Sequence, residues 1–499
     1  MKKIAFLSVA AMMSFGLVAH ADMDNLNITG DIMMEYFYAN DFDLTSAKNT
    51  WSEVDFLRME ADLAFQADLD DNITARISLK VDRAFDQTNI GGVNSLAGTV
   101  DANGNRSFGI GNLALFLQEA FIKIADIGGK GFSLSAGRQF LNYGDDPLAD
   151  NFNKWWGPGF IIADSNTNSP LLLTQLGSYR IDPFDAVVLS YETEQARVDL
   201  IHARDVEDFY ALTENAPRSN DDATLWALYG SYFGIEGHQL DLYVTYNDSN
   251  GYEAIPATLT TLADPGVSAG SLGKFRDRRY IVGGRAAGDI NEQFAYKAEI
   301  AYQFEDPKKV GGVKGQSIEG LGVQGGINYH PDMQYKPNVG FIYTYLGQDG
   351  KDGANRTWDG FFAPFNGKTY GLIAEGIMKT QGGFDPLNQF TNMHVFNVNG
   401  GLEPMERVAW TLDFYYYLLD KKVNAPCNDP PTNTLANRIA KDKSDGGFEF
   451  DTQVDYQFND NLTTFIGGGV FVPGDVFSKA DPKLNDEAYF FRAGMKVKF

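Results

Sequence analysis

The sequence alternates apolar and polar residues over about eighteen separate stretches, each roughly 10 to 16 residues long. Successive side chains of a β-strand point to opposite faces, so each stretch predicts a strand with one apolar and one polar face. The approximate limits are 25–38, 52–68, 72–86, 112–126, 130–143, 178–192, 195–206, 223–235, 237–247, 277–290, 292–304, 316–330, 335–347, 391–403, 405–420, 444–457, 460–472 and 486–499. The pattern predicts an all-β fold.

The connections between these stretches are short and long in turn. Asp70-Asp71 and Asn459-Asp460 are tight turns, whereas 87–111, 144–177 and 348–390 are long loops, some of which can fold inward. Transmembrane β-barrels combine short periplasmic turns with long extracellular loops. We therefore predict a transmembrane antiparallel β-barrel of about 18 strands. A periplasmic β-sandwich or solenoid is the alternative, but neither produces this alternation of loop lengths.

The stretch from Asp486 to Phe499 predicts how the barrel closes. Tyr489, Phe491 and Met495 fall on one face, and basic residues fall on the other. A last strand that pairs with the first leaves no unpaired edge in lipid. We expect the apolar face of this strand to contact hydrocarbon.

The N-terminal residues resemble a secretory signal. Lys2 and Lys3 precede an apolar run from Ile4 to Val18, and Ala19-His20-Ala21 is a small-x-small cleavage site. A membrane-anchoring helix is the alternative, but the run is too short to span a bilayer. We predict a cleaved signal peptide at 1–21, a single barrel domain at 22–499, and a location in the outer membrane of a Gram-negative bacterium.

Composition restricts the partners. The formal net charge of −25 does not suit nucleic acid, but it suits loops lying among divalent-bridged lipopolysaccharide phosphates. Cys427 is the single cysteine, so an intramolecular disulfide cannot form. We expect outer-membrane lipid and lipopolysaccharide to surround the barrel.

The alternation also predicts which charged side chains line the lumen. They include both signs of charge: Arg58, Arg76, Arg197, Lys297, Arg407, Glu60, Asp62, Glu299, Asp413, Glu449 and Asp451. Opposed charges across a pore can order water and filter solutes. Alternatively, each charge only pairs with its neighbour inside a wide, wet barrel.

Several motifs resemble the alginate-export family of outer-membrane barrels. They are Gly137-Arg138-Gln139, Leu141-Asn142-Tyr143-Gly144-Asp145, Phe184-Asp185-Ala186, the segment from Gly446 to Asp451, and Phe471-Val472-Pro473-Gly474. The resemblance implies a monomeric channel, and in one member polyuronate passes an arginine-rich constriction. It makes Arg138 the leading constriction candidate, with Arg180, Arg197 and Arg58 as companions. Since Arg138 shares a parity with Leu134 and Ala136, this role requires a bulge or a position at loop level.

We therefore expect a passive channel for polar solutes, sugar-like molecules or organic ions among them. Dedicated export of an anionic oligo- or polysaccharide is one alternative, although Val188 stands where family members commonly carry a polar residue. A non-transport docking barrel is the other. The resemblance implies a monomer.

The sequence does not favour an enzyme or a cofactor. His202, His238, His330 and His394 lie in separate segments, so no Ser-His-acid arrangement is evident. The loop carboxylates Asp145, Asp146 and Asp150 are weak candidates for a bound metal ion, with a solvated acidic loop as the simpler interpretation.

Overall fold

The computed structural model describes most of the chain from Asn25 to Phe499. The described residues are 25–41, 53–85, 99–100, 106–107, 115–144, 183–204, 223–254, 272–305, 319–347, 361, 370–374, 377, 391–422, 440, 442–478 and 485–499. The predicted signal peptide, Arg180, Cys427, Asp145, Asp146 and Asp150 lie outside them. No helix in the described ranges is long and apolar enough to cross a membrane.

A single sheet of 18 antiparallel strands makes up the body of the molecule. Its strands are β1 (Leu26–Asn40), β2 (Glu53–Asp70), β3 (Ile73–Phe85), β6 (Leu115–Ile124), β7 (Phe132–Gln139), β8 (Phe184–Glu192), β9 (Ala196–Arg204), β10 (Ala223–Ile235), β11 (His238–Ala254), β12 (Leu272–Asn291), β13 (Phe294–Glu305), β14 (Gly320–Tyr329), β15 (Asn338–Leu346), β16 (Met393–Met405), β17 (Val408–Leu419), β18 (Asp445–Gln457), β19 (Leu462–Pro473) and β20 (Ala488–Lys498). Each overlaps one predicted stretch, so the all-β barrel prediction is confirmed.

Four short elements lie in the described parts of the connections. The strands β4 (Thr99–Val100) and β5 (Arg106–Ser107) pair in a separate two-stranded sheet. The 3₁₀-helix η1 (Ile127–Gly129) joins β6 to β7, and α5 (Asp475–Ser478) follows β19.

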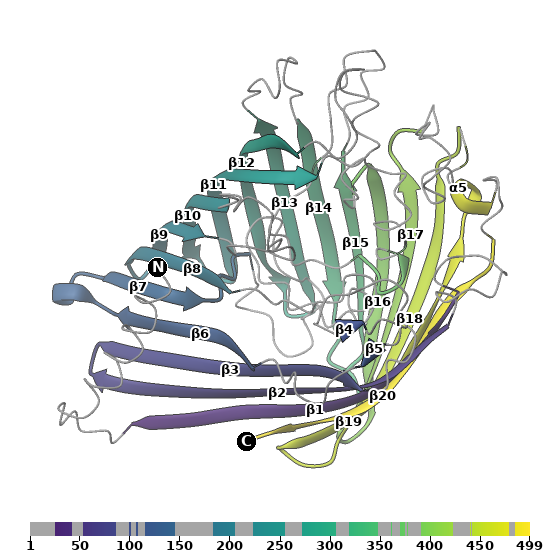
Figure 1. Cartoon of the computed structure of the whole chain (residues 1–499), viewed down its shortest axis with the longest axis horizontal. Helices are drawn as coiled ribbons and strands as arrows, with labels where there is room; N and C mark the ends of the chain where they lie inside the picture. Colours follow the sequence, from purple (N-terminus) through teal and green to yellow (C-terminus); the bar gives the residue numbers. More distant parts are fainter. Residues whose placement is uncertain are drawn as a thin grey trace.

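The sheet closes on itself because β1 pairs with both β2 and β20. In the second pairing Asp31 lies opposite Lys498 and Asn40 lies opposite Tyr489, with ten residue pairs between the two strands. Figure 1 shows the sheet curving from β1 through β11 and back to β20, which lies beside β1. The closed ladder leaves no unpaired strand edge, as predicted from the last stretch.

The two faces of the strands differ as the alternation predicts. On β20 the outward Tyr489 and Met495 are 41% and 48% exposed, whereas Phe490 on the other face is 4% exposed. On β13 Ile300 is 55% exposed, whereas the inward Lys297 is 1% exposed. The outer wall is thus apolar, and the inner wall carries the charged residues.

Two neighbouring strands are longer than their predicted stretches. β11 continues to Ala254 and β12 begins at Leu272, and these two residues face each other in the register. The first added residues of β11, from Asp248 to Asn250, are polar and lack the apolar alternation on which the prediction depended. Pairing of the two added segments with each other extends the strands.

Arg407 does not lie on a lumen-facing strand position, which corrects the prediction. It occupies the turn between β16 and β17 with a φ of +66°. Its guanidinium Nη1 donates a hydrogen bond to the backbone oxygen of Phe458 at 2.7 Å. Because β17 begins only at Val408, the strand alternation does not apply to this residue.

Candidate functional site

Acidic and basic side chains alternate on the lumen wall formed by β20, β1 and β2. Lys496 Nζ lies 3.2 Å from a carboxylate oxygen of Asp31. Four residues further along β1, the carboxylate of Glu35 lies 3.6 Å from Arg492 and 3.9 Å from Arg58. Glu35 faces Arg58 in the register of β1 with β2, so cross-strand pairing brings these charges together.

The same pattern continues onto β3 and β6. Lys80 Nζ lies 2.7 Å from Glu60 and 3.8 Å from Asp62, both on β2. Arg76 Nε donates to the Glu119 carboxylate at 2.6 Å. Both residues of each pair face the lumen, and each positive charge has a carboxylate as its neighbour.

A further set of charges lies on β11, β12 and β13. Arg285 Nη1 lies 2.7 Å from Asp241, and both side chains are 0% exposed. The Tyr243 hydroxyl donates to the Glu299 carboxylate at 2.8 Å. Lys297 lies two residues from Glu299 on the same face and is buried. This wall is therefore also polar, with opposite charges in contact.

The segment 140–144 folds back into the barrel after β7. Leu141 is 4% exposed, and the Tyr143 hydroxyl donates to the Asp199 carboxylate on β9 at 2.9 Å. Arg197 Nε lies 3.0 Å from both oxygens of the same carboxylate. Burial and the adjacent Asp199 carboxylate raise the pKa of the Tyr143 phenol, so the hydroxyl remains a hydrogen-bond donor.

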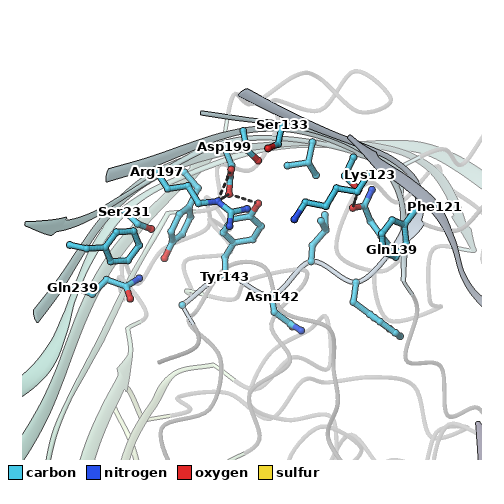
Figure 2. Close-up of a pocket in the computed structure, with 18 residues that line it drawn as sticks. Phe121, Lys123, Ser133, Gln139, Asn142, Tyr143, Arg197, Asp199, Ser231 and Gln239 are labelled. Carbon is cyan, nitrogen blue, oxygen red and sulfur yellow. Dashed lines mark hydrogen bonds and ion pairs between the residues drawn. The ribbon is translucent and has the colours of Figure 1, made fainter. Parts of the chain in front are cut away.

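A cavity of about 500 Å³ lies between this segment and the inner wall. Figure 2 shows Tyr143 pointing up to Asp199, with Lys123 reaching across the space beside it. The lining combines aromatic rings, four serines, the amides of Gln139 and Gln239, and the charged residues Lys123, Arg197 and Asp199. The mixture is typical of a site that contacts polar organic molecules.

A second inward segment is held by Glu449 on β18. The Glu449 carboxylate accepts hydrogen bonds from the backbone N–H groups of Leu372, Ile373 and Ala374 at 2.6, 2.8 and 2.7 Å. A carboxylate that accepts several backbone N–H groups forms strong, charge-assisted hydrogen bonds. Glu449 thus fixes part of the connection between β15 and β16 inside the barrel.

Gly371 allows this segment to approach the wall closely. Its φ is +99°, and a Cβ atom there would lie 2.2 Å from the Tyr417 hydroxyl. That hydroxyl donates to the backbone oxygen of Tyr370 at 2.8 Å. Only glycine accommodates both the left-handed backbone and the contact with Tyr417.

Ten of the predicted site residues lie on the lumen face. They are Arg58, Arg76, Arg197, Lys297, Glu60, Asp62, Glu299, Asp413, Glu449 and Asp451. The structure brings Arg58 together with Glu60, but it places Arg197 beside Asp199, which is not among the residues predicted from the sequence. Asp199 shares the parity of Arg197, so the alternation contained the signal; for residues 370–374 the sequence contains none.

Arg138 lies on the outward face of β7. The pairing of β7 with β8 runs without a shift from Phe132 opposite Tyr191 to Gln139 opposite Phe184, so it contains no bulge. The Arg138 guanidinium lies 3.9 Å from the carboxylate of Asp185, which is 64% exposed. The constriction role required a bulge or a position at loop level, but Arg138 lies within β7, so it is not part of the proposed constriction.

A closed 18-stranded barrel with an apolar outer wall and a charged lumen defines an outer-membrane channel for the passage of polar solutes. The family model described as alginate export matches residues 24–491. This chain therefore belongs to the alginate export family, whose fold is that of transport proteins. A search of curated proteins finds no match to the sequence.

Solved structures that share this fold include outer-membrane proteins of Acinetobacter baumannii and Pseudomonas aeruginosa. OccAB2 of Acinetobacter baumannii is 11% identical, with a TM-score of 0.54, over 96% of this chain and 99% of that chain. OccK9 (OpdG) of Pseudomonas aeruginosa is 10% identical, with a TM-score of 0.52, over 96% and 99%. OpdK of the same species, solved with vanillate, is 12% identical, with a TM-score of 0.51, over 95% and 98%. At these identities the likeness shows the shared fold.

Proposed function

We propose that the channel passes polar solutes, sugar-like molecules and organic ions among them, with only weak selectivity for the sign of charge. The observation that carries this proposal is the pairing of the basic side chains in the lumen. Seven of them lie within 4.0 Å of a carboxylate: Arg58, Arg76, Lys80, Arg197, Arg285, Arg492 and Lys496. A solute that passes them meets local dipoles, not a field of one sign.

The ten lumen-facing residues predicted from the sequence serve in this proposal as pore-lining groups. Glu449 holds the inward segment at residues 372–374, and Arg197 lies beside the inward segment 140–144. Both segments narrow the wide interior that 18 strands enclose. Polar groups on these segments and on the wall can exchange hydrogen bonds with a passing hydroxylated solute.

Dedicated export of an anionic polysaccharide would require a run of cations without carboxylate partners. Among the described lumen residues, the seven pairs above give the opposite arrangement. A docking barrel would need no open pathway, and conductance separates it from a channel.

The test is the single-channel current of the purified protein in a planar bilayer under a salt gradient. We expect an open pore whose reversal potential stays close to zero. A strong preference for anions would instead support polyanion export, and the absence of current would support a docking barrel.

We also propose that residues 1–21 are a signal peptide, that the mature domain begins at Asp22, and that the barrel is a monomer among lipopolysaccharide molecules of a Gram-negative outer membrane. The charge and apolarity of residues 1–21 support the first point. N-terminal sequencing of protein from outer membranes tests it, and sedimentation in detergent tests the monomer.

A further inference from the structure

Lys123 differs from the seven paired basic residues of the lumen. It lies near the end of β6 on the inward face, exposed, with Ser135 of β7 as its cross-strand neighbour. In the described part of the chain no carboxylate oxygen lies within 4.0 Å of its ammonium group. Figure 2 shows its side chain extending across the cavity that segment 140–144 covers.

The other two charged side chains that line this cavity, Arg197 and Asp199, form an ion pair with each other. Both oxygens of the Asp199 carboxylate lie 3.0 Å from Arg197 Nε, and one of them also accepts the Tyr143 hydroxyl. The charges of Arg197 and Asp199 therefore neutralise each other, and the ammonium group of Lys123 supplies the net charge of the cavity lining. That charge attracts an anion.

The rest of the lining fits an organic ring that carries hydroxyl groups. The rings of Tyr143 and Tyr229 lie with their centroids 4.7 Å apart and their planes tilted by 48°, and both rings contribute apolar surface to the lining. The hydroxyls of Ser190 and Ser231 can donate to or accept from a ligand hydroxyl. The volume of about 500 Å³ is within the range of small-molecule sites.

We propose that this cavity is a subsite for a small organic anion with one negative charge and several hydroxyl groups, and that Lys123 pairs with its carboxylate. The subsite rests on the proposed function, because it acts on solutes during their passage. Since Lys123 is the next-to-last residue of β6 before the tight turn to β7, the subsite lies toward the end of the barrel that faces the periplasm in such proteins.

The experiment compares quinate with inositol, two hydroxylated rings of which only quinate carries a carboxylate. Each is added to an open channel in a planar bilayer, and the concentration that halves the current is measured for the wild type and Lys123→Met. The matched control is Lys130→Met, which removes the same charge from the turn after β6 without touching the cavity. Equilibrium binding of quinate to the detergent-purified protein is measured by calorimetry in parallel.

We expect quinate to block the wild type and the Lys130→Met variant alike, and inositol to block far more weakly. Lys123→Met should raise the half-blocking concentration and the dissociation constant by about fivefold, as expected for the loss of one partly exposed ion pair. Equal block by quinate and inositol, or no change on Lys123→Met, overturns the subsite. If the channel carries a normal salt current but quinate neither blocks it nor binds, the subsite is refuted and the channel is not. If no salt current is seen, the channel is refuted. Calorimetry then tests the subsite by itself.

Discussion

The Tyr143 hydroxyl donates a hydrogen bond to the Asp199 carboxylate at 2.9 Å, across 56 residues of sequence. This contact holds the segment that follows β7 against the inner wall of β9. It connects the segment that resembles the family motif to a carboxylate that Arg197 orients. The lumen is thus shaped by a long-range contact as well as by the strands.

Removal of this hydrogen bond should loosen the segment. Tyr143→Phe deletes the donor and leaves the Asp199 carboxylate with Arg197 alone, and hydrogen bonds to charged groups contribute about 1.5–3 kcal/mol. We expect a noisier and larger single-channel current. Tyr191→Phe, on the outward face of β8, is the control and should leave the current unchanged. Identical currents in all three proteins would show that Tyr143 does not anchor the segment.

Glu449→Gln should release the second inward segment. The amide keeps the shape of the side chain, but only one of its two terminal atoms can accept a hydrogen bond, and the charge that strengthens the three backbone contacts is lost. Hydrogen exchange of the Leu372, Ile373 and Ala374 amides should accelerate at least about tenfold, which corresponds to roughly 1.4 kcal/mol.

Asp455→Asn is the control for this substitution, since Asp455 lies on the same face of β18 and accepts a bond from Gln453. It should leave the exchange of those three amides unaltered. Unchanged exchange in the Glu449 variant would mean that other contacts hold the segment.

Arg138→Ala should leave ion selectivity unchanged, because this side chain lies on the outward face and pairs with Asp185. Arg197→Ala should shift the reversal potential toward cation selectivity, because it removes a lumen cation and exposes the charge of Asp199. Both variants are measured under the same salt gradient. If the two variants shift the reversal potential equally, Arg138 acts in the constriction after all.

Asp241→Asn should destabilise the barrel, because it leaves the fully buried Arg285 without its carboxylate. The loss of one partner of a buried pair costs about 3 kcal/mol. We expect a lower urea midpoint for unfolding from lipid vesicles. The double variant Asp241→Leu with Arg285→Leu should recover most of the midpoint, since no buried charge remains; failure to recover would indicate that the pair itself stabilises the wall.

The sequence by itself determined the strands and their faces. The period of two assigned Lys297 and Glu299 to the lumen and Ile300 to the outer wall, and the structure confirms these placements. The strand geometry makes this possible, because every second side chain of a strand must point the same way. The rule does not extend to Arg407, because it stands in a turn and not in a strand.

Only the tertiary structure decided the shape of the lumen. Tyr143 meets Asp199 and residues 372–374 meet Glu449 across long intervals of sequence, and no local period relates such partners. The outward position of Arg138 was likewise settled by the unshifted register of β7 with β8, which depends on the pairing of two strands separated by a long loop. Local alternation fixes the direction of side chains, whereas the inward path of the loops depends on which wall groups can satisfy their backbone and hydroxyl hydrogen bonds.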